Sequence, residues 1–170
     1  MLDGIHKIHL IGIGGSGMRA IANILIQKGY DVSGSDIAES AVISKFRDMG
    51  ATVHIGHNKE YVNGVDAIVR STAIREDNPE IVAAKEQGIT ILHRSDIVKA
   101  VLDVTDGIAV AGAHGKTSTT SMIGQILVEA NADPTVIIGG EVDYLKGSSC
   151  LGKGHFSVVE ADESDGSFLK

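Results

Sequence analysis

The chain has 170 residues, 43% of them hydrophobic, with 15 basic and 22 acidic side chains and a net charge of −7. This length suffices for one large domain, or for one domain plus part of another. The negative charge, the lack of a Lys/Arg-rich tract and the absence of Trp argue against nucleic acid and anionic membranes as partners. No apolar run approaches the ~18 residues that span a bilayer, and the N-terminus lacks the apolar segment of a signal peptide, so we expect a cytoplasmic protein.

The first hundred residues alternate strand-like apolar runs with segments of helical period. A glycine-rich loop after the first strand leads into a helix with apolar residues at i, i+3, i+4 and i+7: Met18, Ile21, Ala22 and Leu25. The expected strands are residues 7–14, 30–36, 51–56, 64–71 and 89–92. Such alternation predicts an α/β fold, with helices packed on a parallel sheet.

Two further helices are expected in this region. Residues 38–49 form one of them. In residues 77–88, Pro79 follows Asn78 and Gly88 closes the segment, which is the pattern of a capped helix with a C-terminal glycine.

The pattern restarts at residues 103–107. Strands are expected at 107–112, 135–140 and 155–162, and a helix at 117–131. We expect this helix to bury one apolar side, formed by Met122, Ile123, Ile126, Leu127 and Ala130. About three strands with one helix are few for an independent α/β domain, so we expect only the first part of a second domain here.

The first glycine loop fits G-x-G-x-x-G, with Gly12, Gly14 and Gly17 between a strand and a helix. Asp36 follows Gly17 by 19 residues, at the end of the next strand. Glycines let a backbone approach a pyrophosphate, a helix N-terminus favours negative charge, and an acid at that strand end can accept hydrogen bonds from a ribose. Taken alone, the spacing indicates NAD; the alternative is a tight turn without a ligand.

A second glycine loop runs from Gly112 to Thr117 and reads G-x-x-G-K-T. Val110 stands where a regular Walker A loop has its first glycine. The shorter loop keeps the chemistry, because backbone N–H groups can cradle phosphate, Lys116 can neutralise it and Thr117 can hold Mg²⁺. The alternative, a solvated lysine in the first turn of a helix, opposes the helix dipole unless an anion is bound.

Four carboxylates stand within six residues at the end of the last expected strand: Glu160, Asp162, Glu163 and Asp165. Their mutual repulsion favours solvation or a shared cation, and Mg²⁺ takes one or two carboxylates together with nucleotide phosphates. We therefore expect at least one of the four to face Mg²⁺. His54 and His57 lack further ligands at zinc spacing, so they are interpreted as surface or core histidines. Cys150 is the only cysteine, which excludes an internal disulfide.

Five stretches in this order, "HLIGIGGSGM", "VSGSD", "STAIREDNPEI", "GAHGKTSTT" and "VVEADESDGSF", resemble the Mur ligase family over essentially the whole chain. The resemblance implies a three-domain cytoplasmic enzyme of peptidoglycan synthesis, of the branch that joins L-alanine to UDP-N-acetylmuramate with ATP. Residues 1–103 would form a Rossmann-like domain that binds the UDP-sugar. Residues 104–170 would begin the central P-loop ATPase α/β domain, and a C-terminal domain would be absent.

The resemblance also implies which residues contact each ligand. The UDP-sugar would be bound by Gly14, Gly15, Ser16, Gly17, Met18, Asp36 and Ser71. ATP would be bound by Gly112, Ala113, His114, Gly115, Lys116, Thr117 and Ser118. Lys116 would be catalytic, and Thr117 and Glu160 would hold Mg²⁺. The chain departs from the family pattern at Ala113, Ser118, Arg70, Thr72 and residues 95–97, which removes no phosphate or metal ligand.

The implied reaction is activation of the lactyl carboxylate by ATP, followed by attack of the L-alanine amine on an acyl phosphate. Two other functions stay open on the residues themselves. The chain could be an NAD-dependent oxidoreductase that uses the first loop, or a nucleotide-binding regulator without catalytic activity.

Overall fold

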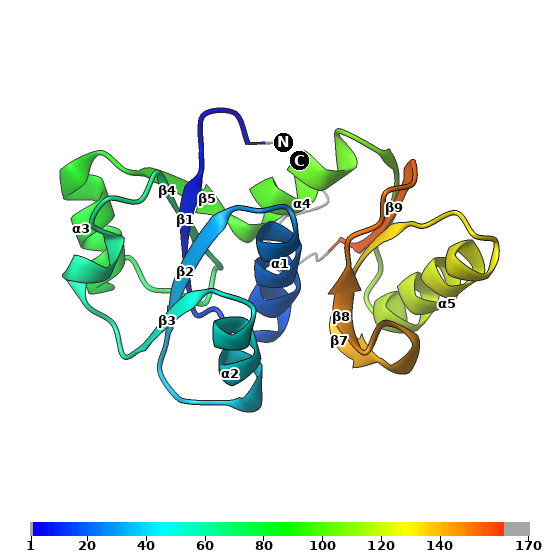
Figure 1. Cartoon of the computed structure of the whole chain (residues 1–170), viewed down its shortest axis with the longest axis horizontal. Helices are drawn as coiled ribbons and strands as arrows, with labels where there is room; N and C mark the ends of the chain where they lie inside the picture. The colour runs from blue at the N-terminus through cyan, green and yellow to red at the C-terminus, as the bar shows by residue number, and fades with distance from the viewer. Residues whose placement is uncertain (1, 162–170) are drawn as a thin grey trace. The chain divides into compact units, whose positions relative to one another are not determined.

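The computed structural model describes residues 2–161, which divide into a first unit, residues 2–94, and a second unit, residues 95–161 (Figure 1). Helix α4 (Arg94–Leu102) begins at this division and ends next to the 103/104 boundary expected from the sequence. No helix within residues 2–161 has the length and apolar character needed to cross a membrane.

The first unit contains a five-stranded sheet in which every described pair of neighbours is parallel. Its strands are β1 (Lys7–Ile11), β2 (Asp31–Asp36), β3 (Thr52–Ile55), β4 (Ala67–Arg70) and β5 (Thr90–His93). Their order in space is β3-β2-β1-β4-β5. The chain adds β2 and β3 on one side of β1 and then β4 and β5 on the other side, so the switch point of the sheet lies between β1 and β4. In open α/β sheets, ligands bind outside the carboxyl ends of the strands at such a switch point.

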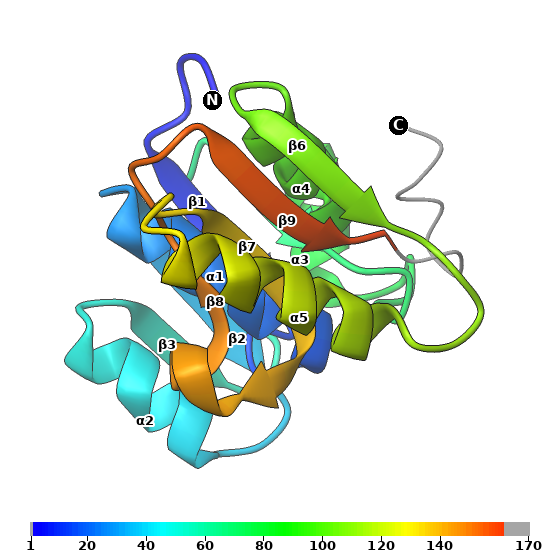
Figure 2. The same ribbon diagram turned by 90° about the vertical axis from the view of Figure 1, so that its right-hand side faces the viewer.

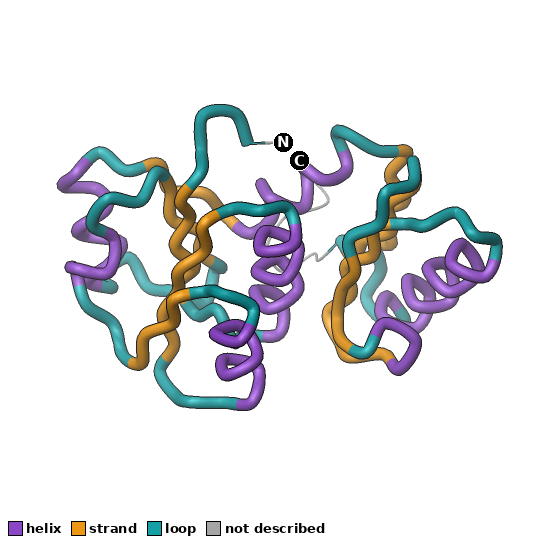
Figure 3. Tube along the Cα trace, viewed as in Figure 1, coloured by secondary structure: helices purple, strands orange, loops and turns teal. Residues whose placement is uncertain are grey.

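Helices cover both faces of this sheet (Figures 1 and 3). One face carries α1 (Ser16–Gln27) and α2 (Ala41–Asp48), and the other carries α3 (Pro79–Gln87) and the 3₁₀ helix η1 (Lys59–Val62). The four apolar positions predicted to face inward from α1 are all buried: Met18, Ile21, Ala22 and Leu25. The fold class expected from the alternation of strands and helices is thus confirmed.

The capping pattern predicted for α3 is also confirmed. The Asn78 side chain accepts a hydrogen bond from the backbone N–H of Glu80, and Pro79 occupies the first helical position. Gly88 ends the helix in the left-handed conformation, with φ of 68°. Ser40 caps α2 in the same manner, by accepting from the N–H of Ile43. These caps fix where both helices begin.

The second unit contains a sheet whose described strands follow the order β6-β9-β7-β8 (Figure 2). The elements are β6 (Asp106–Val110), α5 (Lys116–Glu129), β7 (Thr135–Val142), the 3₁₀ helix η2 (Asp143–Leu145), β8 (Gly147–Cys150) and β9 (Phe156–Glu160). β6, β9 and β7 are parallel, whereas β8 pairs antiparallel with β7. The sequence prediction missed β8 because its central residues, Ser148 and Ser149, are polar although they are buried.

The prediction for the buried side of α5 was wrong. The residues that α5 buries are Thr120 and Gly124, while Met122 and Ile126 are 59% and 67% exposed. A methyl group added at Gly124 would stand 3.2 Å from a methyl carbon of Val136 on β7. Small residues therefore let α5 lie close to the sheet, and a hydrophobicity pattern gives no weight to that kind of contact.

Candidate functional site

The first glycine loop leaves the carboxyl end of β1, beside the switch point of the sheet. Gly12 has φ of +73°, a conformation that side chains disfavour. The carbonyl oxygen of Ser35 accepts hydrogen bonds from the N–H groups of Gly12 (2.8 Å) and Ile13 (3.0 Å). The N–H of Gly14 donates to Asp36 Oδ2 at 2.8 Å. The end of β2 thus holds three successive backbone N–H groups of the loop.

Helix α1 begins directly after this loop, with Gly15 as its N-cap. Within residues 2–161, no side chain caps α1 and no acidic residue lies in its first turn. In contrast, side chains cap α2 and α3. The first N–H groups of a helix lack partners inside the helix and carry partial positive charge, so an uncapped N-terminus can accept an anion.

The residues predicted to bind a UDP-sugar gather at this edge of the sheet, with two qualifications. Gly14 and Gly15 lie in the loop, and Ser16, Gly17 and Met18 form the first turn of α1. The side chain of Met18 is buried, so only its backbone can face a ligand. Asp36 uses both carboxylate oxygens locally, accepting from the N–H of Gly14 and, at Oδ1, from that of Ile37. It therefore shapes the loop, in addition to any contact with a ribose.

Ser71 follows β4, the strand on the other side of the switch point. Its carbonyl oxygen accepts a hydrogen bond from the N–H of Ile74, which forms a turn. A methyl group added at Gly12 would stand 3.4 Å from Ile74 Cδ1. The turn after β4 and the loop after β1 are therefore neighbours, as the switch point requires.

Sequence reasoning gave no role to Arg94, which the structure brings to the same place. A methyl group at Gly17 would collide with the Arg94 guanidinium, so this cation packs against the first turn of α1. A guanidinium at a helix N-terminus and the helical N–H groups can bind the same anion. In the sequence the only signal was a departure from the family pattern next to Arg94.

The second glycine loop connects β6 to α5 within the second unit. Gly115, the N-cap of α5, has φ of +78°, and no side chain of the described residues caps this helix. Lys116 Nζ donates a hydrogen bond to the carbonyl oxygen of Gly112 at 2.7 Å, so the lysine folds back over the loop. Ala113 and His114 are exposed between the two glycines. The loop thus combines free helical N–H groups with one cation.

Thr117 and Glu160, the predicted Mg²⁺ ligands, both lie against a pair of glycines in β7. A methyl group at Gly139 would stand 2.7 Å from Glu160 Oε2, and one at Gly140 would stand 3.3 Å from Thr117 Cγ2. Glu160 Oε1 is buried and has no hydrogen-bond partner within the described part of the chain. Glu160 pairs with Val110, the last residue of β6 before the second loop. A buried carboxylate oxygen without a partner at this strand end can serve as a ligand for Mg²⁺ held jointly with nucleotide phosphates.

Residues 2–161 contain no group of three or more His, Cys, Asp or Glu side chains that could hold a metal without such phosphates. The other three carboxylates predicted near the metal, Asp162, Glu163 and Asp165, lie outside the described residues.

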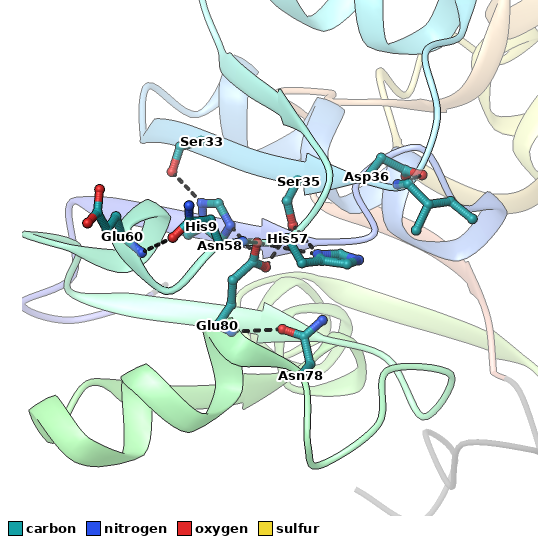
Figure 4. A network of polar contacts seen from close by, with 10 residues as sticks. His9, Ser33, Ser35, Asp36, His57, Asn58, Glu60, Asn78 and Glu80 are labelled. Carbon is teal, nitrogen blue, oxygen red and sulfur yellow. Dashed lines mark hydrogen bonds and ion pairs between the residues drawn. The ribbon is translucent and has the colours of Figure 1, made fainter.

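A buried polar cluster lies on the α3 face of the first unit (Figure 4). Its centre is Glu80, whose carboxylate is fully buried together with His9 and Ser35. Ser35 Oγ donates to Glu80 Oε2 at 2.7 Å, and His57 Nδ1 lies 3.3 Å from Oε1. His9 Nε2 lies 3.5 Å from Oε2, an ion-pair distance. His57, which the sequence left as either a surface or a core histidine, is thus partly buried beside Glu80.

Burial alone would raise the pKa of Glu80. Contacts with His9 and Ser35, together with the charge of His57, outweigh that effect and hold the pKa below its ordinary value. The carboxylate therefore stays ionised inside the fold.

A family model described as "Mur ligase family, catalytic domain" matches residues 7–104 of the chain. The chain belongs to the Mur ligase family. The Mur ligase resemblance stated from five sequence stretches is therefore confirmed, and the matched range contains the first loop, Asp36, Ser71 and Glu80.

Relatives with known names cover both units of this Mur ligase chain. The UDP-N-acetylmuramate--L-alanine ligase of Solidesulfovibrio magneticus is 48% identical over 169 residues, which is 99% of this chain and 37% of the relative. The crystal structure of UDP-N-acetylmuramate-alanine ligase MurC from Thermotoga maritima matches with a TM-score of 0.84 and 36% identity, over 93% of this chain and 37% of that one. The chain thus spans little more than a third of these relatives.

A Mur ligase with a different amine substrate in its name is nearly as similar in fold. It is the UDP-N-acetylmuramate:L-alanyl-gamma-D-glutamyl-meso-diaminopimelate ligase of Neisseria meningitidis. This structure matches with a TM-score of 0.85 and 27% identity, over 94% of this chain and 53% of that one. The fold alone thus does not separate the two kinds of ligase, whereas sequence identity is higher to the alanine ligases.

Proposed function

We propose that this chain is part of an ATP-dependent ligase that joins L-alanine to UDP-N-acetylmuramate. The observation that carries the proposal is the presence of two glycine loops, each leading into a helix that no described side chain caps, in two separate units. One loop would bind the diphosphate of the UDP-sugar and the other the phosphates of ATP. Relatives named as alanine ligases, at 48% and 36% identity, support this choice of substrates.

The first loop would hold the UDP-sugar through backbone and short side chains. Gly14, Gly15, Ser16, Gly17 and the backbone of Met18 would follow the diphosphate, while Asp36 and Ser71 would lie near the uridine. Two solved structures that match with TM-scores of 0.84 and 0.85 carry UDP-N-acetylmuramate in their names, although their amine substrates differ. The proposal that the first loop binds UDP-N-acetylmuramate therefore does not depend on which amine the enzyme joins to it.

The second loop would bind ATP through residues 112–118: Gly112, Ala113, His114, Gly115, Lys116, Thr117 and Ser118. Lys116 would leave the carbonyl of Gly112 and neutralise charge on the transferred phosphoryl group, which is its proposed catalytic role. Thr117 and Glu160 would hold Mg²⁺, which neutralises the charge of nucleotide phosphates when it is bound.

The proposed reaction has two steps. A lactyl carboxylate oxygen of UDP-N-acetylmuramate bonds to the γ-phosphorus of ATP, the bond to the bridging oxygen breaks, and ADP leaves. The L-alanine amine then attacks the acyl phosphate carbon, phosphate leaves, and the amine loses a proton to give the amide. No step requires a covalent bond to the protein, so the enzyme acts by positioning reactants and neutralising charge.

Calorimetry on the 170-residue chain tests this proposal against the two alternatives left open by the sequence. We expect saturable binding of UDP-N-acetylmuramate, Mg²⁺-dependent binding of ATP, and no binding of NADH. Binding of NADH without UDP-N-acetylmuramate would instead support an oxidoreductase. In the complete enzyme, phosphate release that depends on L-alanine would distinguish a ligase from a nucleotide-binding regulator.

A further inference from the structure

Three successive residues of β2 hold the first glycine loop. Gly34 leaves room for Ile13, because a methyl group at Gly34 would stand 2.7 Å from Ile13 Cδ1. The Ser35 carbonyl oxygen accepts the N–H groups of Gly12 and Ile13. The next residue, Asp36, accepts the N–H of Gly14. The position of the loop therefore depends on the position of this strand end. Ser35 is the central one of the three residues that hold the loop.

The side chain of Ser35 is held from the opposite side, by Glu80 in the first turn of α3. Ser35 Oγ donates to Glu80 Oε2 at 2.7 Å, and both residues are fully buried (Figure 4). The other oxygen, Oε1, accepts from the N–H of Asn58 at 3.3 Å and lies 3.3 Å from His57 Nδ1. Glu80 thus fastens Ser35 to the segment that precedes η1 and to α3.

A buried carboxylate is costly unless charges and donors surround it. Here the surroundings include the first turn of α3, the donors Ser35 and Asn58, and the histidines at positions 9 and 57. An apolar side chain would fill the same space without this cost. The geometry of the cluster therefore calls for a role other than packing.

We propose that Glu80 is a positioning residue for nucleotide binding: it fixes Ser35, whose carbonyl holds Gly12 and Ile13 in the geometry that accepts a diphosphate. Among the described residues, the side chain of Glu80 forms polar contacts with Ser35, His57, Asn58 and His9, none of which is proposed to contact the UDP-sugar. The binding consequence rests on the proposed function of the first loop, whereas the effect on the loop itself does not.

Two variants break the connection and a third serves as control. Ser35→Ala removes the hydroxyl and keeps the carbonyl that holds the loop. Glu80→Gln keeps the size of the side chain and removes its charge. Ser44→Ala is the control, because Ser44 is exposed on α2 and lies outside the polar cluster.

Amide hydrogen exchange, followed by NMR on the 170-residue chain without ligand, tests the positioning directly. We expect Ser35→Ala and Glu80→Gln each to speed exchange of the Gly12 and Ile13 amides about tenfold or more, with the Val69 amide in β4 unchanged. The Ser44→Ala chain should exchange like the wild type. Unchanged loop exchange, or equal acceleration at Val69, would overturn the proposal, because Glu80 would then serve only general stability.

Calorimetry with UDP-N-acetylmuramate tests the consequence for binding. Ser35→Ala and Glu80→Gln should each raise the Kd about tenfold, and the double variant should be no worse than either single one, since both break the same connection. Wild-type affinity in both single variants would overturn the binding role. Absence of binding by the wild-type chain would instead contradict the proposed function, and hydrogen exchange would still decide the positioning role.

Discussion

The carboxylate of Asp36 holds the backbone of Gly14, with 2.8 Å between Asp36 Oδ2 and Gly14 N. Its second oxygen, Oδ1, accepts the N–H of Ile37 at 2.8 Å. A methyl group at Gly14 would stand only 3.0 Å from Oδ2, so glycine permits this close approach. The acid that sequence spacing assigns to a ribose therefore also sets the path of the loop.

Replacement of Asp36 by Asn should weaken binding of UDP-N-acetylmuramate. Asn has one carbonyl oxygen, so one of the two backbone N–H groups loses its acceptor. Loss of a hydrogen bond to a charged group costs about 1.5–3 kcal/mol, which corresponds to a roughly ten- to hundredfold higher Kd in calorimetry. Asp31→Asn, at the exposed start of the same strand, should bind like the wild type. Equal affinity of Asp36→Asn and wild type would contradict this account of the loop.

Gly139→Ala should disturb the proposed Mg²⁺ site without touching the first unit. The added methyl group would stand 2.7 Å from Glu160 Oε2 and force this carboxylate to move. We expect the Mg²⁺ concentration that supports half-maximal ATP binding to rise several-fold, measured by calorimetry at fixed ATP. Gly147→Ala in β8 is the control, since nothing lies within 4 Å of its added methyl group. If the Mg²⁺ requirement stayed unchanged, Glu160 would not be a ligand of Mg²⁺.

The sequence predicted the strands and helices of the first unit because most of them bury apolar side chains in a regular pattern, as β1, β4 and α1 do. It predicted the positions of both loops because closely spaced glycines between a strand and a helix are typical of phosphate-binding loops. Prediction failed where small or polar residues carry the packing. Ser148 and Ser149 form the centre of β8, and Gly124 rather than Met122 brings α5 to the sheet.

The cluster around Glu80 was beyond the reach of sequence patterns for another reason. Glu80 was visible only as part of a helix start after Asn78 and Pro79. Its partners His9 and Ser35 are 71 and 45 residues away in the chain, and only the order of strands in the sheet brings them together. A long-range polar contact of this kind leaves no local periodicity.

Glu80 should make the stability of the first unit depend on acid pH. Its pKa in the folded chain is lowered, so its stabilising effect is complete above the unfolded value of about 4.3 and is lost as pH falls through the folded value. Urea unfolding between pH 5 and 3, followed by the NMR signal of Val69, should therefore show a smaller loss of stability for Glu80→Gln than for wild type. Glu39→Gln, which changes an exposed carboxylate paired with Arg47, should keep the wild-type dependence.

Three histidines near Glu80 also have to be considered when the pH dependence of stability is interpreted. His9 and His57 contact the carboxylate directly, and His54 lies close enough for its pKa to respond to both His9 and Glu80. The pKa of His54 is lowered, chiefly by burial. Measuring both chains over the same range, pH 5 to 3, cancels titrations that wild type and variant share. Identical slopes for wild type and Glu80→Gln in this range would show that the carboxylate is not stabilised in the fold.

Lys116→Ala should weaken binding of ATP without changing binding of UDP-N-acetylmuramate. Lys116 donates to Gly112 within the second loop, so its loss removes both a cation for phosphate and a contact that orders the loop. We expect ATP affinity to fall about tenfold or more, with UDP-N-acetylmuramate affinity unchanged, in parallel calorimetric titrations. Lys153→Ala removes another lysine of the second unit and serves as control. An equal loss of both ligands in Lys116→Ala would mean that the loops do not act separately.

Arg94 should contribute to binding of the UDP-sugar diphosphate, a role that no sequence pattern assigned to it. The guanidinium packs on Gly17, in the first turn of an α1 whose N-terminus no described side chain caps. The guanidinium and the N–H groups of the first turn lie close together, so one diphosphate can contact both. Guanidinium groups also bind phosphate oxygens in pairs.

Arg94→Gln should therefore raise the Kd for UDP-N-acetylmuramate about tenfold at low salt and make binding less sensitive to added salt, because one charged contact is removed. Arg75→Gln is the matched control: its guanidinium is largely exposed and pairs with Asp77 in the turn before α3. Calorimetry from 50 to about 300 mM salt would measure both effects, in a range where the screening length falls to roughly 6 Å. If Arg94→Gln and Arg75→Gln gave the same affinity and the same salt dependence, Arg94 would only pack against α1, and the diphosphate would be held by the loop backbone alone.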